Sequence, residues 1–430
     1  MSIMLKDTQF TIKGFVVWSV CVLFFLYEFF LRVSLGSFQH PLMHDLHLSA
    51  FEYSLLSSTL FFVIYGIMQI PVGLIIDKIG LKKSLMIGAS ICALASFSFA
   101  YASTFWLAVV ARVLMGLGAS FGFLSLLVAV NDWMPHRHNA LFIGLSQFIG
   151  TMGPMFAAGP LESYTASGHI AWQLVFKVLG FIGLALFVMI TFFVDNRHET
   201  AEKYSILKRP ESTKRSLLKL FSRAQAWYIA LFSASVYLII EYLSENEGRV
   251  FIVLKGFSEN FASYMITLSW LGYALGCPLL GFLSDYTQRR KPVLVAAATM
   301  SVMSMLLIIF SNHRYGLIIG FFMLGFSASG QSVGFAIISE QFKQQFIGIG
   351  LALNNALIMI LSAINAPLIG WMIDRSRGAA NFGLHTYQYA FLILLFIAII
   401  SVILSFFFIK ETFCKSAVDF SVLDARKRSS

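Results

Sequence analysis

The stretch that decides the fold occurs twice, first as PVGLIIDKIGLKK at residues 71–83. A glycine precedes an aspartate by four positions there, and Lys82 and Lys83 close the stretch after a further glycine. The second copy, PLLGFLSD at residues 278–285, keeps the Gly-to-Asp spacing 208 residues later but lacks the following glycine. Because this offset is close to half of the 430 residues, the repeat predicts a chain built from two similar halves.

Both copies lie in very apolar surroundings. Hydrophobic residues make up 58% of the chain, charged residues only 12%, and the mean hydropathy is +0.78. This composition argues against a water-soluble fold, and also against a disordered chain, because disorder requires low hydrophobicity and a high density of charge. We therefore expect an all-α integral membrane protein that is surrounded by the lipid bilayer.

The apolar residues are grouped into segments of suitable length to cross a membrane. A helical span needs about 20 apolar residues for a hydrocarbon core of roughly 30 Å, and twelve segments meet this requirement. One long polar loop separates the sixth from the seventh, which predicts two six-helix bundles at residues 1–194 and 226–409, a loop at 195–225 and a tail at 410–430. The predicted spans are residues 14–36, 51–76, 84–104, 105–130, 140–161, 171–194, 226–247, 261–284, 292–311, 315–339, 346–373 and 387–409.

The basic residues predict the orientation. If the N-terminus is cytoplasmic, 23 of the 31 Lys and Arg residues fall on the cytoplasmic side and four on the opposite side. Since cytoplasmic loops carry an excess of Lys and Arg, we expect both termini to be cytoplasmic. The net charge of +10 then reflects topology, and because the cations are scattered in short clusters it does not indicate nucleic-acid binding.

Two motifs give the chain a resemblance to a known family. Residues 73–83 are similar to the GxxxD(K/R)xGxKK signature of the major facilitator superfamily, and residues 112–119, RVLMGLGA, resemble its RxxxGxGA pattern. With twelve spans and a half-chain repeat, the resemblance covers essentially the whole chain. It implies a secondary transporter that works by alternating access between two pseudo-symmetric bundles. Such a protein is not an enzyme and needs no cofactor, and we expect a monomer in a bacterial inner membrane.

The direction of transport is less clearly marked. Residues 150–160 are only partly similar to the antiporter motif of the family, because Ala157 and Ala158 stand where a glycine pair is expected. Residues 27–32 and 65–73 look more like the uptake branches for organic anions, amino acids or peptides.

The repeated stretch also suggests a conformational gate. Its glycines let a neighbouring helix approach, and its aspartates and cations can form a charge lock at the cytoplasmic mouth. The alternative is that these short loops carry cations only for topology. The predicted gate residues are Gly73, Asp77, Lys82, Lys83, Gly281, Asp285, Arg289 and Arg290.

A few charged residues lie inside the predicted spans, where an ionised side chain costs at least a few kcal/mol. At about 1.5 Å per residue, four of them fall about 8 to 10 Å below the outer edge of the core. Two pairs have i,i+4 spacing, so the members of each share one helix face. The predicted substrate-binding residues are Glu28, Arg32, Arg112 and Lys177 in the first half, and Glu241 and Glu245 in the second.

These charges suggest the chemistry of the solute. A cationic wall facing an acidic wall suits a zwitterion, so an amino acid or short peptide is the favoured substrate, ahead of other small organic anions. We expect proton-coupled symport, with Glu28 and Glu241 as proton carriers, because protonation removes a buried charge that resists occlusion. No nucleotide-binding motif occurs in the sequence, so an ion gradient is expected to drive transport.

Several alternatives remain open. The nearest alternative is uptake or export of another organic solute, such as a siderophore, a carboxylate or a drug. A nutrient sensor without transport activity could use the same fold. Arg112 is also compatible with a structural tie, and Lys177 with a position at the membrane edge. His40, His44 and His47 have helical spacings that suit metal binding or pH sensing, as well as a solvated loop.

Overall fold

The structure is a computed structural model that describes residues 10–134, 139–161, 164, 170–196, 223–341, 347–376 and 383–414. Every regular element in these ranges is helical, which confirms the predicted all-α class. The first helical set contains α1 (Ile12–Val33), α2 (Gln39–Asp45), α3 (Ala50–Ser54), α4 (Leu60–Ile79), α5 (Leu81–Ala100), α6 (Phe105–Trp133), α7 (Asn139–Phe156) and α9 (Trp172–Phe193). The second helical set contains α12 (Ala224–Glu245), α13 (Gly248–Leu254), α14 (Glu259–Thr287), α15 (Lys291–Phe310), α16 (Arg314–Ala328), α17 (Gly330–Glu340), α18 (Ile347–Ser376) and α19 (Leu384–Ile403).

Eleven helical segments among the described residues are long and apolar enough to cross a membrane. Ten of them agree with predicted spans to within four residues at either end. The first, Ile12–Asp45, contains the predicted span 14–36 and extends nine residues beyond it. The remaining predicted span, at 140–161, is formed by α7 and the π-helical turn η4 (Ala157–Leu161) and is not among the eleven. Large apolar side chains cover the outside of the bundle: Trp106 is 73% exposed and Phe192 is 76% exposed. Such a surface suits lipid and not water.

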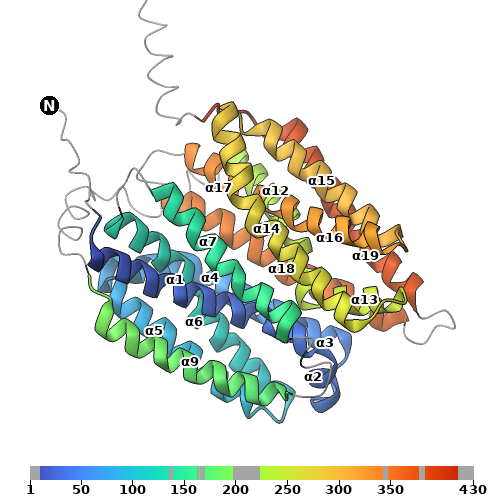
Figure 1. Ribbon diagram of the computed structural model, residues 1–430, viewed down its shortest axis with the longest axis horizontal. Coiled ribbons are helices and arrows are strands. Elements are labelled where there is room, and N and C mark those ends of the chain that lie inside the picture. The colour runs from blue at the N-terminus through green and yellow to red at the C-terminus, as the bar shows by residue number, and fades with distance from the viewer. Residues whose placement is uncertain are drawn as a thin grey trace, which may run out of the picture.

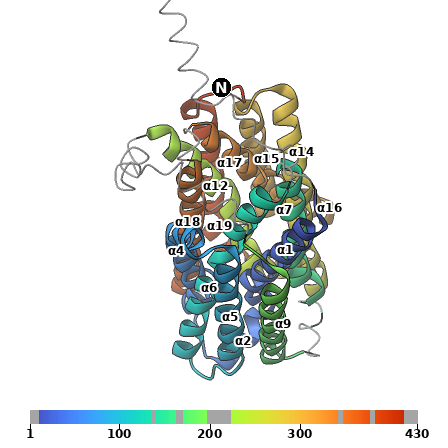
Figure 2. The ribbon, with the colours of Figure 1, turned by 90° about the vertical axis from the view of Figure 1, so that its left-hand side faces the viewer.

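The two helical sets lie side by side, the first coloured blue to green and the second yellow to red (Figure 1). Across the junction α4 packs against α18, and α7 packs against α14. The short helices α2, α3 and α13 lie together at one end of the bundle (Figure 1), which we call the outer end because it is the predicted external side. In Figure 2, α2 marks this end at the bottom of the bundle.

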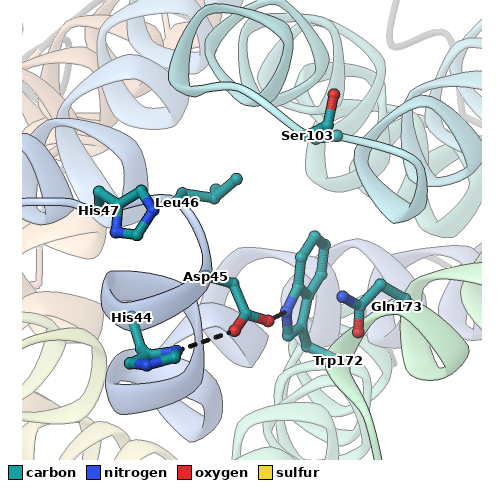
Figure 3. A pocket seen from close by; sticks show the side chains of 8 residues that line it. His44, Asp45, Leu46, His47, Ser103, Trp172 and Gln173 are labelled. Carbon is teal, nitrogen blue, oxygen red and sulfur yellow. Dashed lines mark hydrogen bonds and ion pairs between the residues drawn. The ribbon is translucent and has the colours of Figure 1, made fainter.

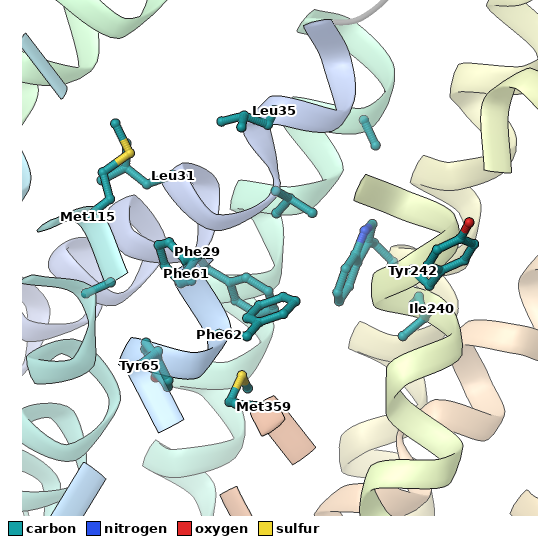
Figure 4. Packing of buried hydrophobic residues seen from close by; sticks show 14 of the residues in the cluster. Phe29, Leu31, Leu35, Phe61, Phe62, Tyr65, Met115, Ile240, Tyr242 and Met359 are labelled. Atoms are coloured by element: carbon teal, nitrogen blue, oxygen red, sulfur yellow. The ribbon is translucent and has the colours of Figure 1, made fainter. Parts of the chain in front are cut away.

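Apolar side chains fill the junction between the sets. Phe61, Phe62 and Tyr65 of α4 are buried on one side of it, as are Tyr242 of α12 and Met359 of α18 on the other (Figure 4). These residues belong to one continuous cluster that extends through both helical sets. The cluster therefore holds the outer parts of the two sets together.

A glycine permits a close approach between the sets at the outer end. A Cβ atom on Gly36 would overlap the carbonyl oxygen of Ser244 at the end of α12. By contrast, a Cβ atom on Gly73 or Gly281 would meet no described atom within 4 Å. The described contacts thus close the outer end tightly, while the two motif glycines lie in open surroundings.

Two of the turns that depart from α geometry near the outer end lie beside the central junction. The 3₁₀ helix η1 (Ser34–Phe38) follows α1, and the π-helical turn η2 (Leu55–Thr59) precedes α4. Such turns change the backbone hydrogen-bond pattern, and at membrane depth each carbonyl that loses its usual partner needs another. The buried Arg112 donates to carbonyls of η2 and of the last turn of α1, just before η1.

Candidate functional site

The central feature of the site is an ion pair that joins the two helical sets. Arg32 of α1 donates from Nη2 to the hydroxyl of Tyr237 at 3.0 Å, and the same nitrogen lies 3.4 Å from Oε1 of Glu241. Ser362 of α18 donates to the other oxygen of Glu241 at 3.0 Å. All four side chains are buried. Arg32 and Glu241, both predicted as substrate-binding residues, thus lie together at the junction as a direct ion pair.

Glu28 lies one turn before Arg32 on α1 and is completely buried. Its side chain packs against α6, where a Cβ atom on Gly122 would lie 2.7 Å from Cγ of Glu28. Neither carboxylate oxygen has a hydrogen-bond partner within the part of the chain that the structure describes. Burying an ionised carboxylate without a partner is far more expensive than burying a carboxylic acid. Glu28 is therefore well placed to hold a proton.

Glu245 lies one turn beyond Glu241, nearer the outer end. Ser58 donates to its Oε2 at 3.4 Å, and the hydroxyl of Tyr53 donates to its backbone carbonyl at 3.0 Å. Its Oε1 has no hydrogen-bond partner among the described residues. Glu245 is therefore buried against the first helical set, in contact with residues that close the outer end.

A group of polar contacts closes the outer end, and we call it the outer latch. Asn246 accepts from Ser57 at 2.7 Å and donates to Ser58 at 2.9 Å, and Gln39 donates to Glu247 at 2.8 Å. The carboxylate of Asp374, at the end of α18, accepts the first backbone N–H groups of α3 at 3.2 and 2.7 Å. Each contact joins one helical set to the other, so the latch must open if the outer end is to admit a solute.

Arg112 has a different role from the other buried cations. Its Nε donates to the carbonyl of Leu56 at 3.1 Å, its Nη1 to Leu31 at 2.9 Å, and its Nη2 to Arg32 and Ser57, both at 2.7 Å. A fifth contact, at 3.7 Å, joins Nη1 to the sulfur of Met115. Every N–H of the guanidinium group therefore has an acceptor: two are carbonyls of the last turn of α1, and two are carbonyls of the π-helical turn η2 before α4. This geometry supports the structural alternative for Arg112 over direct substrate binding.

Lys177 and Arg249 lie away from the central ion pair. The ammonium of Lys177 lies 4.7 Å from the ring centre of Tyr101, which is 68% exposed at the end of α5. Arg249 pairs with Glu259 at 3.4 Å near the outer end. The structure thus supports the membrane-edge alternative for Lys177, and it brings only Glu28, Arg32, Glu241 and Glu245 of the predicted binding residues close to the central junction.

Among the described gate residues, the ion pairs of the second copy are shorter than that of the first. Arg290 pairs with Asp285 at 2.6 Å and with Glu340 at the end of α17 at 2.8 Å. In the first copy Lys82 lies 3.8 Å from Asp195, and Lys83 is exposed. Arg289 of the second copy is also exposed. The side chain of Asp77 lies outside the described residues. The described ion pairs of both copies stay within their own helical set.

The segment after α19 reinforces the network of the second copy. Thr412 donates to Glu340 at 2.5 Å, and the carboxylate of Glu411 accepts the backbone N–H groups of Arg290 and Lys291 at 2.9 Å each. Partial burial acts to raise the pKa of Glu411, but bonds from four backbone N–H groups outweigh it and hold the pKa below its usual value. Glu411 thus serves as a charged cap at the start of α15.

Two histidines of the first outer loop, His44 and His47, line a surface pocket of about 480 Å³ (Figure 3). Asp45 in this pocket accepts from the indole of Trp172 at 2.9 Å and lies 3.2 Å from Nδ1 of His44. His40 does not line this pocket. No group of three or more potential metal ligands occurs among the described residues. The metal-site alternative therefore gains no support from this part of the structure.

Several residues at the junction carried no strong signal in the sequence. Ser362, which holds Glu241, is one of many serines in apolar segments, and Trp270 of α14 is one of seven tryptophans. Asn355 donates to Gln69 across the junction at 3.0 Å, whereas the buried amides of Asn354 and Asn365 have no partner among the described residues. Only the depth of these residues within the predicted spans could have indicated a role.

Comparisons with known proteins identify the wider relationship. The sequence model of the Major Facilitator Superfamily matches this chain twice, at residues 20–254 and 242–418. Three relatives are the inner membrane transport protein RhmT of Escherichia coli (23% identity), the 3-(3-hydroxy-phenyl)propionate transporter of the same organism (25%) and the hexuronate transporter of Bacillus subtilis (25%). These alignments cover 61%, 72% and 57% of the chain, and 65%, 75% and 58% of the respective relatives.

Two solved structures have the same fold. The D-xylose-proton symporter superposes with a TM-score of 0.74 at 17% identity, covering 94% of this chain and 99% of that one. A bacterial homologue of the human lysosomal transporter Spinster, in an inward-facing and unoccupied conformation, gives a TM-score of 0.71 at 15% identity, covering 93% and 97%. At such low identity these likenesses establish the fold alone.

Proposed function

Because the chain belongs to the major facilitator superfamily, a group of multi-pass membrane transporters, we propose that it carries a small organic anion together with protons. The observation that carries this proposal is the buried group of Glu28, Arg32 and Glu241 at the junction of the two helical sets. It combines a cation that can bind a carboxylate with two carboxylates that can take up protons.

The ion pair between Arg32 and Glu241 is loose enough to be exchanged. Its N–O distance of 3.4 Å exceeds the roughly 2.7 to 2.9 Å of a strong charge-assisted hydrogen bond. A substrate carboxylate can therefore replace Glu241 as the partner of Arg32 if Glu241 takes up a proton. Ser362 remains in place to bond the protonated Glu241. Proton binding and anion binding then favour each other at a single arginine.

The formal charges of five buried side chains at and beside the junction support coupling to protons. Arg32 and Arg112 against Glu28, Glu241 and Glu245 leave an excess of one negative charge when all five are ionised. A further anion in this state would add to the repulsion. Protonation of Glu28 and Glu241 would instead leave one positive charge, which a monovalent anion neutralises. Since buried uncompensated charge is expensive, the neutral loaded state is the one best suited to cross between the two faces.

The relatives favour an anion over the amino acid or peptide expected from the sequence. By their names, two of them carry 3-(3-hydroxy-phenyl)propionate and hexuronate, and both solutes are carboxylates. A zwitterion remains the second candidate, because Arg32 and Glu241 lie close enough to bind its carboxylate and its amine at once. Import by a monomer in the inner membrane, with both termini cytoplasmic, completes the proposal.

Transport in proteoliposomes tests this function. A panel of carboxylates, amino acids, dipeptides and iron chelates would be offered with and without an inward proton gradient. We expect carboxylates to accumulate only with the gradient, and Glu28→Gln or Glu241→Gln to abolish accumulation while leaving solute exchange measurable. Glu259→Gln is a matched control, because Glu259 pairs with Arg249 at the outer end and is half exposed. Accumulation that is unchanged in Glu241→Gln would exclude Glu241 as the proton carrier, and binding without exchange would favour a sensor.

A further inference from the structure

Four aromatic side chains form a group beside the guanidinium group of Arg32. Two of them contact the guanidinium group, and the other two pack against these two. The face of Phe29, one turn from Arg32 on α1, lies 3.8 Å from the guanidinium carbon. Trp270 meets Phe29 edge-on with ring centres 5.3 Å apart, and Tyr273 lies 5.8 Å from Trp270. Tyr237 completes the group, 5.4 Å from Tyr273 and in hydrogen-bond contact with Arg32. We call these four residues the aromatic group.

The aromatic group belongs to both helical sets. Phe29 comes from the first set, whereas Tyr237, Trp270 and Tyr273 come from α12 and α14 of the second. Relative movement of the sets therefore separates Phe29 and Arg32 from the other three rings. A solute that lies between them would be released when the sets part, as alternating access requires.

Two buried donors in this region have no acceptor in the described structure. The Nε1 of Trp270, a side chain with no exposed surface, has no hydrogen-bond partner among the described residues, and neither has the Nε of Arg32. Buried tryptophan and arginine donors normally have partners, because an unsatisfied polar group away from water is costly. The hydroxyls of Tyr237 and Tyr273 are already bonded, to Arg32 and to Gln331.

We propose that the transported anion is an aromatic carboxylate with a hydroxyl or ether oxygen on its ring. This inference rests on the proposed function and names its substrate class. The carboxylate binds Arg32, the ring lies against the aromatic group, and the ring oxygen accepts a hydrogen bond from Nε1 of Trp270. Aromatic rings attract one another in edge-on and offset arrangements, so the group favours a flat solute over a saturated one.

A polyhydroxylated acid fits this surface less well. A sugar acid has several hydroxyls, each of which needs a partner once it leaves water. Around Arg32 the aromatic group offers few free donors, because the hydroxyl of Tyr273 already donates to Gln331 and the hydroxyl of Tyr237 already bonds Arg32 and Glu241. A solute with a single ring oxygen needs only the donor of Trp270. A sugar acid would leave several of its hydroxyls without a hydrogen-bond partner. Selection by unmatched polar groups is strong in buried sites.

Competition among four carboxylates in proteoliposomes tests the inference on the unaltered protein. The probes are 3-phenylpropionate, its 3-hydroxyphenyl analogue, 3-cyclohexylpropionate and glucuronate. We expect the phenyl compound to exceed the cyclohexyl compound about threefold to tenfold in kcat/KM, and the ring hydroxyl to add a further factor of about three to ten. Proton-driven transport of glucuronate in preference to all three would overturn the aromatic class and leave the proposed function intact. If no carboxylate of any kind moves, the proposed function fails as well.

Two variants of Trp270 separate the ring from its N–H group. Trp270→Phe keeps an aromatic ring and removes the donor, so it should cancel the advantage of the hydroxyphenyl compound over 3-phenylpropionate while keeping the preference for phenyl over cyclohexyl. Trp270→Leu should in addition remove the preference for phenyl over cyclohexyl. If Trp270→Phe, folded as shown by size-exclusion chromatography, keeps the full hydroxyl advantage, Trp270 does not contact the ring oxygen and the proposed arrangement is wrong.

Discussion

Replacement of Arg112 by methionine tests whether this buried cation holds the helices together or binds substrate. Methionine keeps the length of the aliphatic chain but has no donors. In the structure the guanidinium group joins two carbonyls at the end of α1, those of Leu31 and Arg32, to two carbonyls of the π-helical turn before α4. The substitution would remove every one of these bonds.

The number of bonds sets the expected magnitude. A hydrogen bond from a charged group to a buried acceptor contributes about 1.5 to 3 kcal/mol. The carbonyl of Leu31 keeps a second donor in the hydroxyl of Ser34, at 3.1 Å, so the other carbonyls bear most of the loss. Allowing for relaxation, we expect Arg112→Met to lower the free energy of unfolding by at least about 4 kcal/mol, a large part of the stability of a typical domain. Arg112→Lys should recover little of this, because three donors on one nitrogen cannot reach all four carbonyls.

Thermal unfolding in detergent, followed by size-exclusion chromatography, provides the assay. We expect Arg112→Met to lower the Tm by about 5 °C or more. Lys177→Met is the matched control, since its contact with an exposed tyrosine contributes only about 0.5 to 1 kcal/mol. The structural interpretation would be refuted by an Arg112→Met protein that unfolds at the wild-type temperature but no longer binds substrate.

Three further predictions concern the ends of the bundle. Gly36→Ala should weaken closure of the outer end, measured as longer spin-label distances between the two helical sets, whereas Gly281→Ala, with open space around it, should leave them unchanged. Asp374→Ala removes a cap that joins the sets, so it should shift the same distances in the same direction, and unchanged distances would exclude Asp374 from the latch. Because Glu411 has a lowered pKa when folded, it stabilises the protein above its unfolded pKa of about 4.3 and loses this effect as the pH falls. Glu411→Gln should therefore lower the Tm at pH 7, and the difference from wild type should shrink below about pH 4; a constant difference would contradict the assignment.

Much of the fold could be predicted because each membrane span is selected by a single physical requirement. A helix must be long and apolar to cross the bilayer, so hydropathy located α1, α12 and α19 to within a few residues. The irregular turns at Ser34–Phe38 and Leu55–Thr59 were not predicted. Their sequences, SLGSF and LLSST, contain small polar residues that also occur inside regular membrane helices. The hydrogen bonds from a distant arginine to carbonyls beside them could not be read from the sequence.

The site was predicted in part, and for a related reason. Helical spacing placed Glu28 and Arg32 on one face, and matching positions in the two halves placed Glu241 opposite them, as the structure has it. Depth alone also grouped Arg112 and Lys177 with these residues, but depth does not give the direction of a side chain around its helix. Arg112 points to backbone carbonyls and Lys177 to a ring at the edge of the bundle. Such directions depend on how the helices pack.

The proposed coupling of protons to an organic anion at Arg32 and Glu241 is tested most directly by recording proton movement itself. Proteoliposomes that contain a pH-sensitive dye would be exposed to a saturating aromatic carboxylate in the absence of any imposed pH gradient. We expect the lumen to acidify as the anion enters through the wild-type protein, and to keep its pH in Glu241→Gln while labelled anion still exchanges. Entry of the anion through the wild-type protein without acidification of the lumen would contradict the proposed mechanism.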